Sequence, residues 1–441
     1  MVLLPSRLFV DAKGRSFLMF LIDYFTDNSR YLCLLGIVVV LAIAVLFSRH
    51  RRHISGRLVV SALAMQAIIG FFILRTGVGR FLVGGIAGGI ARLYNAADDG
   101  IHFVFGALGI NQPPWGVVFA FKVLPVIIFF GAFMSMLFHF GIVQLIVTGL
   151  ARLVRPFLKT SGAETLCAAS HCFLGQTEAP LLIKNYLEGM TRSEILLVMV
   201  SGMGAISGSI MALYASFGVP IIHLLGASMM AIPSTILISK ILYPELGKPA
   251  TAGDVKINIP VPSKNFLDAI SMGTGDGLTL ALNIGAMLIV FIAFVSVING
   301  FLGWCGVELN LLFAWMGSSW HLPELSLQAI LGVFFMPFSW LMGLTGADAF
   351  VGAELMGIKV AFNEMIAYTR LVAAHLPERS VALLTYALCG FANFSSIGIQ
   401  LGGIGALVPS QRQVLSEFGF LAVLGGTLAN LLSAMVVGLL I

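Results

Sequence analysis

The chain has 441 residues, of which 59% are apolar and only 10% are charged, and its formal net charge is +5. A soluble globular protein carries about 25% charged residues, so this composition excludes a soluble enzyme, a disordered protein and a nucleic-acid-binding module. The five cysteines show neither zinc nor redox spacing and lie in or beside apolar stretches, which favours buried small side chains. The sequence therefore predicts an all-α polytopic membrane protein.

Eight stretches are apolar and long enough to cross a hydrocarbon core of about 30 Å. A less apolar segment over 81–112 carries polar and charged residues on one side, which predicts a helix lying along the membrane interface. The eight predicted spans cover residues 31–48, 58–75, 115–140, 194–217, 219–242, 278–303, 380–408 and 418–440.

Basic residues orient these spans. RHRRHISGR (49–57), between the first two spans, holds four arginines, and the positive-inside rule places this loop in the cytoplasm. Alternation from there puts both termini outside. It also puts Arg370 and Arg379 outside, against the rule.

Two further stretches, 165–190 and 333–370, are apolar at both ends but interrupted in the middle by glycine, threonine and charged residues. A charge at the bilayer centre costs about 2.5–3.5 kcal/mol on insertion scales and usually marks a substrate or ion pathway. These stretches predict two re-entrant hairpins, the first entering from the inside and the second from the outside.

Each predicted hairpin precedes a span with a polar break, which predicts a discontinuous helix. A shift of 188 residues that sets Gly202 on Gly390 also sets Gln176 on Glu364, so the two halves resemble each other. Inverted repeats with broken helices are the plan of secondary transporters, which bind their substrate near the bilayer midplane. Unwound backbone is tolerated there because it lines a wet cavity or is buried in protein.

These patterns predict four parts along the chain. Two of them are repeats, each consisting of a hairpin, a broken helix and a following helix. The parts are 1–164, with an N-terminal segment, scaffold helices and the interfacial helix; 165–243, the first transport repeat; 244–325, with a cytoplasmic loop, an interfacial segment and a scaffold helix; and 326–441, the second transport repeat.

The first predicted hairpin contains the sharpest polar cluster, Gln176–Thr177–Glu178. Amide, hydroxyl and carboxylate groups offer directional hydrogen bonds to a polar solute. The alternative is a polar hairpin tip that faces cytoplasmic water. His171, five residues earlier, is either a group that titrates near neutral pH or a hydrogen-bonded core histidine.

Polar residues of the second repeat also have two interpretations. Glu364 is either a substrate ligand or a residue on a helix surface. Asn393 and Ser396 either bind substrate or join helices by hydrogen bonds, a common use of polar residues in membranes, and Phe391 is singled out only by its place beside Asn393. The sequence has no metal-ligand spacing and no phosphate-binding glycine loop, so we expect no cofactor and no direct drive by ATP.

At this point a family becomes recognisable. GQTEAPLLIKNYL (175–187) and CGFANFSSIGI (389–399) resemble the paired signature segments of the concentrative nucleoside transporters, and GIHFVFG (100–106) and VAFNEMIAY (360–368) match further landmarks. The resemblance runs from about residue 31 to residue 440. It implies a homotrimer in the bacterial inner (plasma) membrane, with a scaffold of the first, second, third and sixth spans and a mobile transport domain that carries both hairpins.

The resemblance also implies roles for the polar residues at the breaks. The first hairpin is expected to contact the nucleobase through Gln176, Thr177 and Glu178. The second repeat is expected to contact the ribose hydroxyls through Glu364, Asn393 and Ser396, with Phe391 near the sugar and base.

The coupling ion is where the chain departs from the family pattern. Sodium-coupled relatives place an asparagine at the position of His171 and a serine near Ala205, together with backbone carbonyls near Leu174 and Ile206. Because histidine and alanine stand here instead, we expect proton coupling, with His171 or Glu364 as the proton carrier and no metal site assigned. Sodium coupling is the alternative, if a two-residue slip of the alignment brings in a serine.

The predicted function is therefore a secondary active symporter that imports nucleosides across the bacterial inner membrane. A sodium-coupled symporter is the nearest alternative, and a passive pore or a sensor for nucleosides is the alternative of another class. An enzyme is not expected, because no nucleophile–base pair or carboxylate dyad stands out. The predicted partners are nucleosides, membrane lipid and further copies of the chain, and the preferred base stays open.

Overall fold

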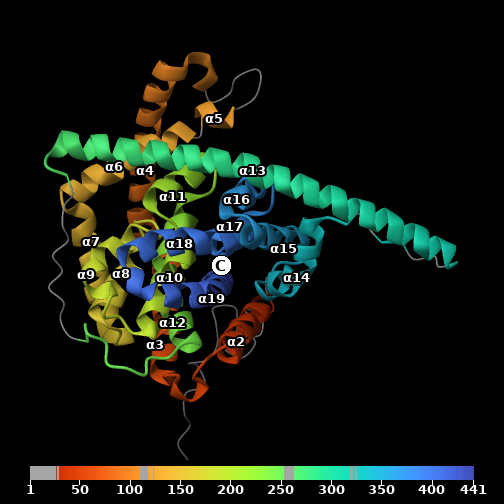
Figure 1. Cartoon of the computed structure of the whole chain (residues 1–441), viewed down its shortest axis with the longest axis horizontal. Helices are drawn as coiled ribbons and strands as arrows, with labels where there is room; N and C mark the ends of the chain where they lie inside the picture. Colours follow the sequence, from red (N-terminus) through yellow and green to blue (C-terminus); the bar gives the residue numbers. More distant parts are fainter. Residues whose placement is uncertain are drawn as a thin grey trace, which may run out of the picture.

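The computed structural model describes Thr26 and residues 29–109, 118–122, 124–252, 263–317, 321–322 and 325–441. Every regular element within these residues is a helix, as expected for an all-α membrane protein (Figure 1). The N-terminal segment before Thr26 and the junction between the predicted interfacial segment and the third span lie outside the described residues.

The predicted spans are found as helices. In the described part of the chain, six helical stretches are long and apolar enough to cross a membrane, with α10 and α11 counted together as one. Five of them coincide with predicted spans, and the sixth, Ile292–Trp315, overlaps the predicted span 278–303 in part. The first predicted span is a shorter apolar helix, and the seventh is divided between two helices. The helices of the N-terminal part are α2 (Arg30–Leu46), α3 (Gly56–Arg75), α4 (Gly77–Phe105), α5 (Phe119–Lys122), α6 (Leu124–His139) and α7 (Ile142–Leu158).

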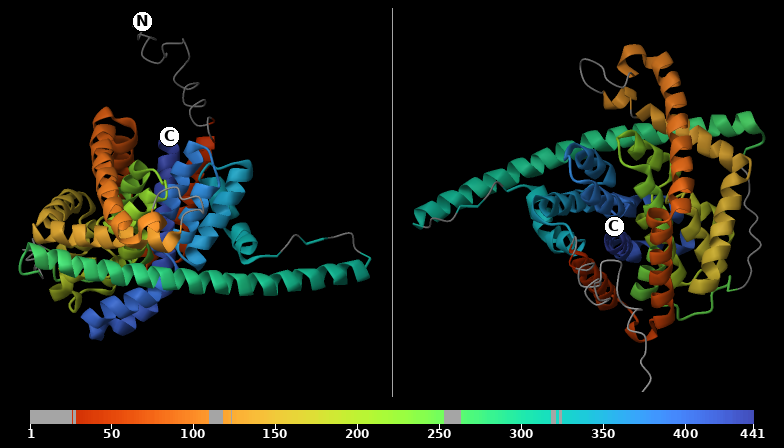
Figure 2. Two further views of the ribbon diagram at one scale, coloured as in Figure 1. Left: turned by 90° about the horizontal axis from the view of Figure 1, so that it is seen from above. Right: turned by 180° about the vertical axis from the view of Figure 1, so that it is seen from behind.

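Helix α13 (Phe266–Trp315) differs most from its prediction, because it is one continuous helix of 50 residues. At a rise of 1.5 Å per residue it is about 75 Å long, and its C-terminal half projects beyond the other helices (Figures 1 and 2). Its N-terminal half packs closely on α6. Glycines allow this approach, since a Cβ on Gly273 would lie 2.6 Å from the carbonyl oxygen of Gly131. Small residues commonly permit such contacts between membrane helices.

The first repeat begins with a short helix, a tip and a return segment. α8 (Gly162–Ser170) leads to the tip at 171–178, and the chain returns through η4 (Ala179–Ile183) and α9 (Lys184–Leu187). Ser161 and Glu164 form a capping box at the start of α8, an arrangement that pairs the first free backbone N–H groups of a helix. The repeat continues with α10 (Arg192–Gly204), α11 (Gly208–Ser216) and α12 (Ile221–Leu242).

The second repeat follows the same order but starts with an additional helix. The predicted hairpin over 333–370 contains three helices rather than two, and the turn that precedes Glu364 is at 362–363. The prediction of two arms was too simple, because GLTG (343–346) makes an earlier turn, with positive φ at its two glycines. The helices are α14 (Leu327–Leu341), α15 (Gly346–Ala361), α16 (Glu364–Ala373), α17 (Glu378–Leu388), α18 (Phe394–Leu407), η5 (Pro409–Gln411) and α19 (Arg412–Leu440).

The core of the molecule lies between the two repeats. Helix α19 runs through the centre (Figure 1) and packs against α10, α12, α17 and α18. In the most apolar window of α10–α11, 89% of the residues are buried, whereas the value for the C-terminal half of α13 is 6%. The two broken helices therefore meet inside the protein, and α13 presents its apolar side chains outward.

Candidate functional site

The two helix breaks touch each other. α10 and α11 are separated at 205–207, and α17 and α18 at 389–393. Gly390, in the second break, has φ +147°, which favours glycine. A Cβ there would lie 2.7 Å from the carbonyl oxygen of Met203 and 2.9 Å from the carbonyl carbon of Gly204, at the end of α10. Only glycine allows the second break to approach the first this closely.

Polar side chains start the helices that follow each turn or break. Asn363 accepts a hydrogen bond from the backbone N–H of Ile366 at 3.0 Å, and Asn393 accepts one from the backbone N–H of Ser396 at 3.0 Å. Ser207 caps α11 in the same way. Asparagine and serine are preferred at this position because their side-chain oxygens satisfy unpaired N–H groups. The caps therefore fix where α16, α18 and α11 begin.

Glu364 is the centre of the first polar group. Its side chain is buried between α16, α11 and α18. Its Oε1 accepts a hydrogen bond from the hydroxyl of Tyr214 at 2.7 Å, and its Oε2 accepts one from Nδ2 of Asn393 at 3.2 Å. The structure thus brings together the two predicted ribose ligands, Glu364 and Asn393.

Tyr214 is a member of this group that sequence reasoning missed. It lies within an apolar helix, 2.7 Å from a carboxylate oxygen that is 150 residues away in sequence. A buried tyrosine hydroxyl usually needs a hydrogen-bond partner, and that requirement was the available signal in the sequence. The partner itself depends on how α11 packs against α16.

A second polar group joins the first hairpin to α18. Nε2 of Gln176 donates a hydrogen bond to Oγ of Ser396 at 3.3 Å, and Nε2 of Gln400 donates to Oε1 of Gln176 at 3.2 Å. Gln400 also donates to the carbonyl oxygen of Met199 at 3.0 Å. The structure therefore places the predicted base ligand Gln176 beside the predicted ribose ligand Ser396. Gln400 was missed, although it lies one helical turn after Ser396 and so shares its face.

The other predicted ligands lie at the edge of these groups. Thr177 packs against α18, since its Cγ2 is 2.4 Å from the position of a Cβ on Gly403. Glu178 is exposed, and its Oε2 accepts a hydrogen bond from the backbone N–H of Gly175 at 3.0 Å. Phe391 is half-buried in the second break. In the described structure, neither Glu178 nor Phe391 is hydrogen bonded through its side chain to the two polar groups.

Apart from Glu364, the ion-coupling candidates lie at the tip of the first hairpin and in the break between α10 and α11. His171 is buried at the end of α8, and its Nε2 lies 3.1 Å from the position of a Cβ on Gly202. Among the described residues this nitrogen has no hydrogen-bond partner. The tip is held to α11 by the N–H of Gly208, which donates to the carbonyl oxygen of Phe173 at 2.9 Å. The remaining candidates, Leu174, Ala205 and Ile206, are also buried.

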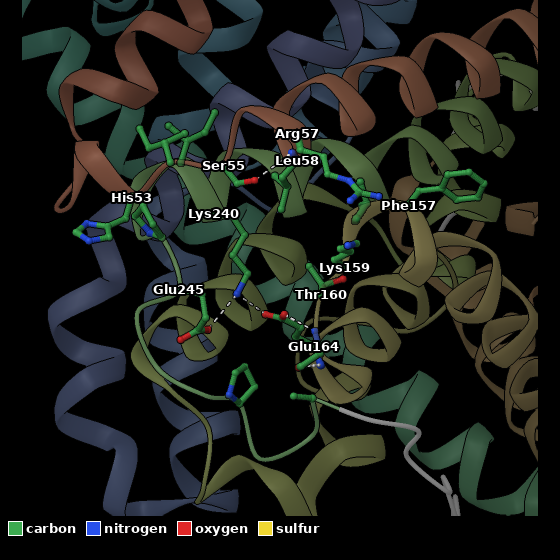
Figure 3. Close-up of a pocket in the computed structure, with 17 residues that line it drawn as sticks. His53, Ser55, Arg57, Leu58, Phe157, Lys159, Thr160, Glu164, Lys240 and Glu245 are labelled. Atoms are coloured by element: carbon green, nitrogen blue, oxygen red, sulfur yellow. Dashed lines mark hydrogen bonds and ion pairs between the residues drawn. The ribbon is translucent and has the colours of Figure 1, made fainter.

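A separate polar region stabilises the base of the first hairpin. A cavity of about 300 Å³ lies between α3, the end of α7, the start of α8 and the end of α12. At this cavity the ammonium of Lys240 lies 2.7 Å from Oε2 of Glu164 and 3.3 Å from Oε2 of Glu245 (Figure 3). None of the substrate-site residues lines this cavity, and over the described ranges no group of three or more possible metal ligands is found.

Comparisons with known proteins agree with this architecture. Three family models match the chain: the N-terminal part of the Na⁺-dependent nucleoside transporters over 35–108, a nucleoside recognition (gate) region over 120–221, and the C-terminal part of the Na⁺-dependent nucleoside transporters over 223–438. Together they cover nearly all of the chain between residues 35 and 438.

Relatives resemble the chain over nearly its full length. An uncharacterised transporter of Haemophilus influenzae is 41% identical, covering 92% of this chain and 97% of the relative. The nucleoside permease NupC of Helicobacter pylori is 38% identical, covering 94% of this chain and 98% of the permease. The solved structure of CNTnw in an inward-facing substrate-bound state is 36% identical, with a TM-score of 0.84 over 93% of this chain and 97% of that one. The chain therefore belongs to the concentrative nucleoside transporter family, whose members are cation-coupled transporters and not enzymes.

Proposed function

We propose that this chain imports nucleosides across the bacterial inner membrane as a symporter driven by the proton gradient. The observation that carries the proposal is the buried carboxylate–amide–hydroxyl group of Glu364, Asn393 and Tyr214, beside the Gln176–Ser396 pair, where two broken helices meet. Substrate sites between discontinuous helices near the midplane are characteristic of secondary transporters.

The chemistry of this site suits a ribose. A carboxylate accepts hydrogen bonds from two vicinal hydroxyls, and an amide and a serine hydroxyl add a donor and an acceptor. We assign the ribose to Glu364, Asn393 and Ser396, with Phe391 against the sugar and base. The nucleobase is assigned to Gln176, Thr177 and Glu178, because an amide and a carboxylate can form hydrogen bonds with the edge of a base. Oε2 of Glu178 accepts from the backbone of Gly175, and its Oε1 can accept a hydrogen bond from a base.

Proton coupling is supported by the position of His171. His171 is a buried titratable group beside the break between α10 and α11, and Glu364, the second candidate carrier, is buried beside the break between α17 and α18. Sodium coupling is the second candidate function, and it is favoured by the descriptions of the matching family models and by a sodium/nucleoside cotransporter of rat that is 37% identical. Ala205, Ile206 and Leu174 are then the positions around the ion.

The assembly and the orientation are part of the same proposal. The outward apolar face of α13 fits contact with further copies of the chain, and we propose a homotrimer in which each protomer has its own pathway and lipid covers the remaining apolar surface. The arginine-rich loop at 49–57 is placed in the cytoplasm and both termini outside. The first, second, third and sixth spans form the scaffold, and the two repeats form the moving transport domain.

Uptake into proteoliposomes tests this function. Labelled uridine and adenosine are offered to vesicles with an imposed proton gradient, an imposed sodium gradient or neither. Accumulation above equilibrium with protons alone is the expected result. Accumulation that requires sodium overturns the proton assignment, and equilibration without accumulation makes the protein a passive pore. Protein-free vesicles are the control for leakage.

A further inference from the structure

Lys359 is a buried lysine whose ammonium has no carboxylate partner. Its side chain is 1% exposed, and in the described part of the chain no carboxylate oxygen lies within 4.0 Å of its Nζ. Lys240, the other buried lysine considered above, is paired with Glu164 and Glu245. Burying a charge is costly unless other groups take over the role of water, so the contacts of Lys359 must compensate for its burial.

The ammonium instead binds groups at the ends of the broken helices. Nζ of Lys359 donates hydrogen bonds to the carbonyl oxygen of Ala387 at 2.9 Å and to Oδ1 of Asn430 at 2.6 Å. Nδ2 of Asn430 in turn donates to the carbonyl oxygen of Gly204 at 2.7 Å. Ala387 lies in the last turn of α17, and Gly204 is the last residue of α10. Carbonyls at these positions lack helical partners and carry partial negative charge, so a cation is favoured there.

The contacts of Lys359 join the same parts of the chain that carry Glu364 and Asn393. Lys359 lies near the end of α15, and Glu364 follows the turn after α15. Ala387 lies just before the second break, and Asn393 ends that break. The hydrogen bond between Lys359 and Ala387 therefore joins the two segments that hold Glu364 and Asn393, whose side chains meet at 3.2 Å.

In the sequence alignment of the two halves, a basic residue falls at the same position in each half. The shift of 188 residues that sets Gly202 on Gly390 also sets His171 on Lys359. In the structure, Nε2 of His171 lies 3.1 Å from the position of a Cβ on Gly202. Oδ1 of Asn430, which binds Lys359, lies 2.7 Å from the corresponding position on Gly390. His171 therefore lies beside Gly202, whereas Lys359 is linked to the surroundings of Gly390 through Asn430.

We propose that Lys359 is a positioning residue of the nucleoside site. Its ammonium, which belongs to the second hairpin, binds the carbonyl end of α17 directly and the carbonyl end of α10 through Asn430. In this way it fixes the distance between Glu364 and Asn393. The inference rests on the proposed nucleoside-binding role of these two residues, but it does not depend on which ion drives transport.

Replacement of Lys359 by methionine tests the need for the charge, since methionine keeps most of the side-chain volume. We expect the purified Lys359→Met variant to bind uridine at least about tenfold more weakly than the wild type, as for the loss of a hydrogen bond to a charged group. Lys240→Met is the matched control. It removes a buried lysine from a different region, so it should lower the thermal unfolding midpoint while uridine affinity stays within about twofold.

Rescue by a small amine separates charge from volume. Lys359→Ala removes three methylenes and the ammonium, which n-propylammonium supplies as a separate ion. We expect millimolar n-propylammonium, but not 1-propanol, to restore uridine binding to Lys359→Ala and to leave Lys240→Met unchanged. Equal rescue by 1-propanol, or wild-type affinity in Lys359→Met, overturns the inference.

Two further measurements keep the outcome interpretable. If Lys359→Met does not fold, Asn430→Ala removes the same link from its other side, and it should weaken uridine binding at least about fivefold; unchanged affinity contradicts the inference. If the wild type binds uridine and the Lys359→Met variant binds it with the same affinity, the inference is rejected and the proposed function is not. Wild-type protein that binds no nucleoside rejects the proposed function, and the inference with it.

Discussion

Replacement of Glu364 by glutamine probes the ribose assignment directly. In the structure one carboxylate oxygen accepts from Tyr214 at 2.7 Å and the other from Asn393 at 3.2 Å. A carboxylate oxygen accepts two hydrogen bonds, so each retains one position for a ribose hydroxyl. Glutamine keeps the shape of the side chain but presents an N–H₂ group to one of these donors.

The expected loss follows from the charge of the acceptor. A hydrogen bond to a charged group contributes about 1.5–3 kcal/mol, which corresponds to a decrease in uridine affinity of roughly 10- to 150-fold. Because the carboxylate is the group that accepts hydrogen bonds from the ribose hydroxyls, the preference for uridine over 3′-deoxyuridine should also be lost in Glu364→Gln. Calorimetric titration of the purified protein with both compounds measures the two quantities together.

A matched control is available on the same hairpin. Glu354 lies on α15 and pairs with Arg370 at 2.9 Å, away from the substrate group. Glu354→Gln makes the same chemical change and should leave uridine affinity within about twofold, because partly exposed ion pairs contribute little. Glu364→Gln with wild-type affinity, or with its preference against 3′-deoxyuridine retained, would refute the ribose assignment.

Three further outcomes are expected. Gly390→Ala should lower the free energy of unfolding by about 1–3 kcal/mol, because the residue has φ +147° and a Cβ there would lie 2.7 Å from the carbonyl oxygen of Met203. A thermal unfolding midpoint in detergent equal to that of the wild type would contradict this. Gln400→Leu should weaken uridine binding by about 0.5–1.5 kcal/mol through loss of its hydrogen bond to Gln176, and an unchanged dissociation constant would show that this bond does not order the base side of the site. His171→Asn should make uridine uptake respond to sodium and lose its response to an imposed proton gradient, since a hard cation prefers oxygen ligands; a variant that keeps full proton-driven uptake would remove this histidine from coupling.

Much of the site could be predicted from local sequence signals. Glycine and polar residues in otherwise apolar spans predicted both breaks, and the 188-residue shift related Gln176 to Glu364. The structure then pairs Glu364 with Asn393, and Gln176 with Ser396. The breaks stand out in the sequence because unwound backbone and buried polar groups are rare in membrane helices.

The residues that were missed depend on packing between distant segments. Tyr214 and Gln400 each lie on a helix whose sequence alone gives no partner, and their partners are 150 and 224 residues away. The contacts of Lys359 with Ala387 and Asn430 arise in the same way. The length of α13 was also missed, because a span fitted to the thickness of a bilayer was expected over 278–303, whereas the helix continues beyond both ends of that range.

The central claim is that nucleoside and proton cross together, and the most direct measurement is uridine-dependent proton entry. Proteoliposomes that contain a pH-sensitive dye are placed in sodium-free buffer with the membrane potential clamped, and uridine is added outside. We expect the lumen to become more acidic only when uridine is present and only with wild-type protein, not with Glu364→Gln. Uridine uptake without any change in lumenal pH, or uptake that begins only when sodium is added, would contradict it.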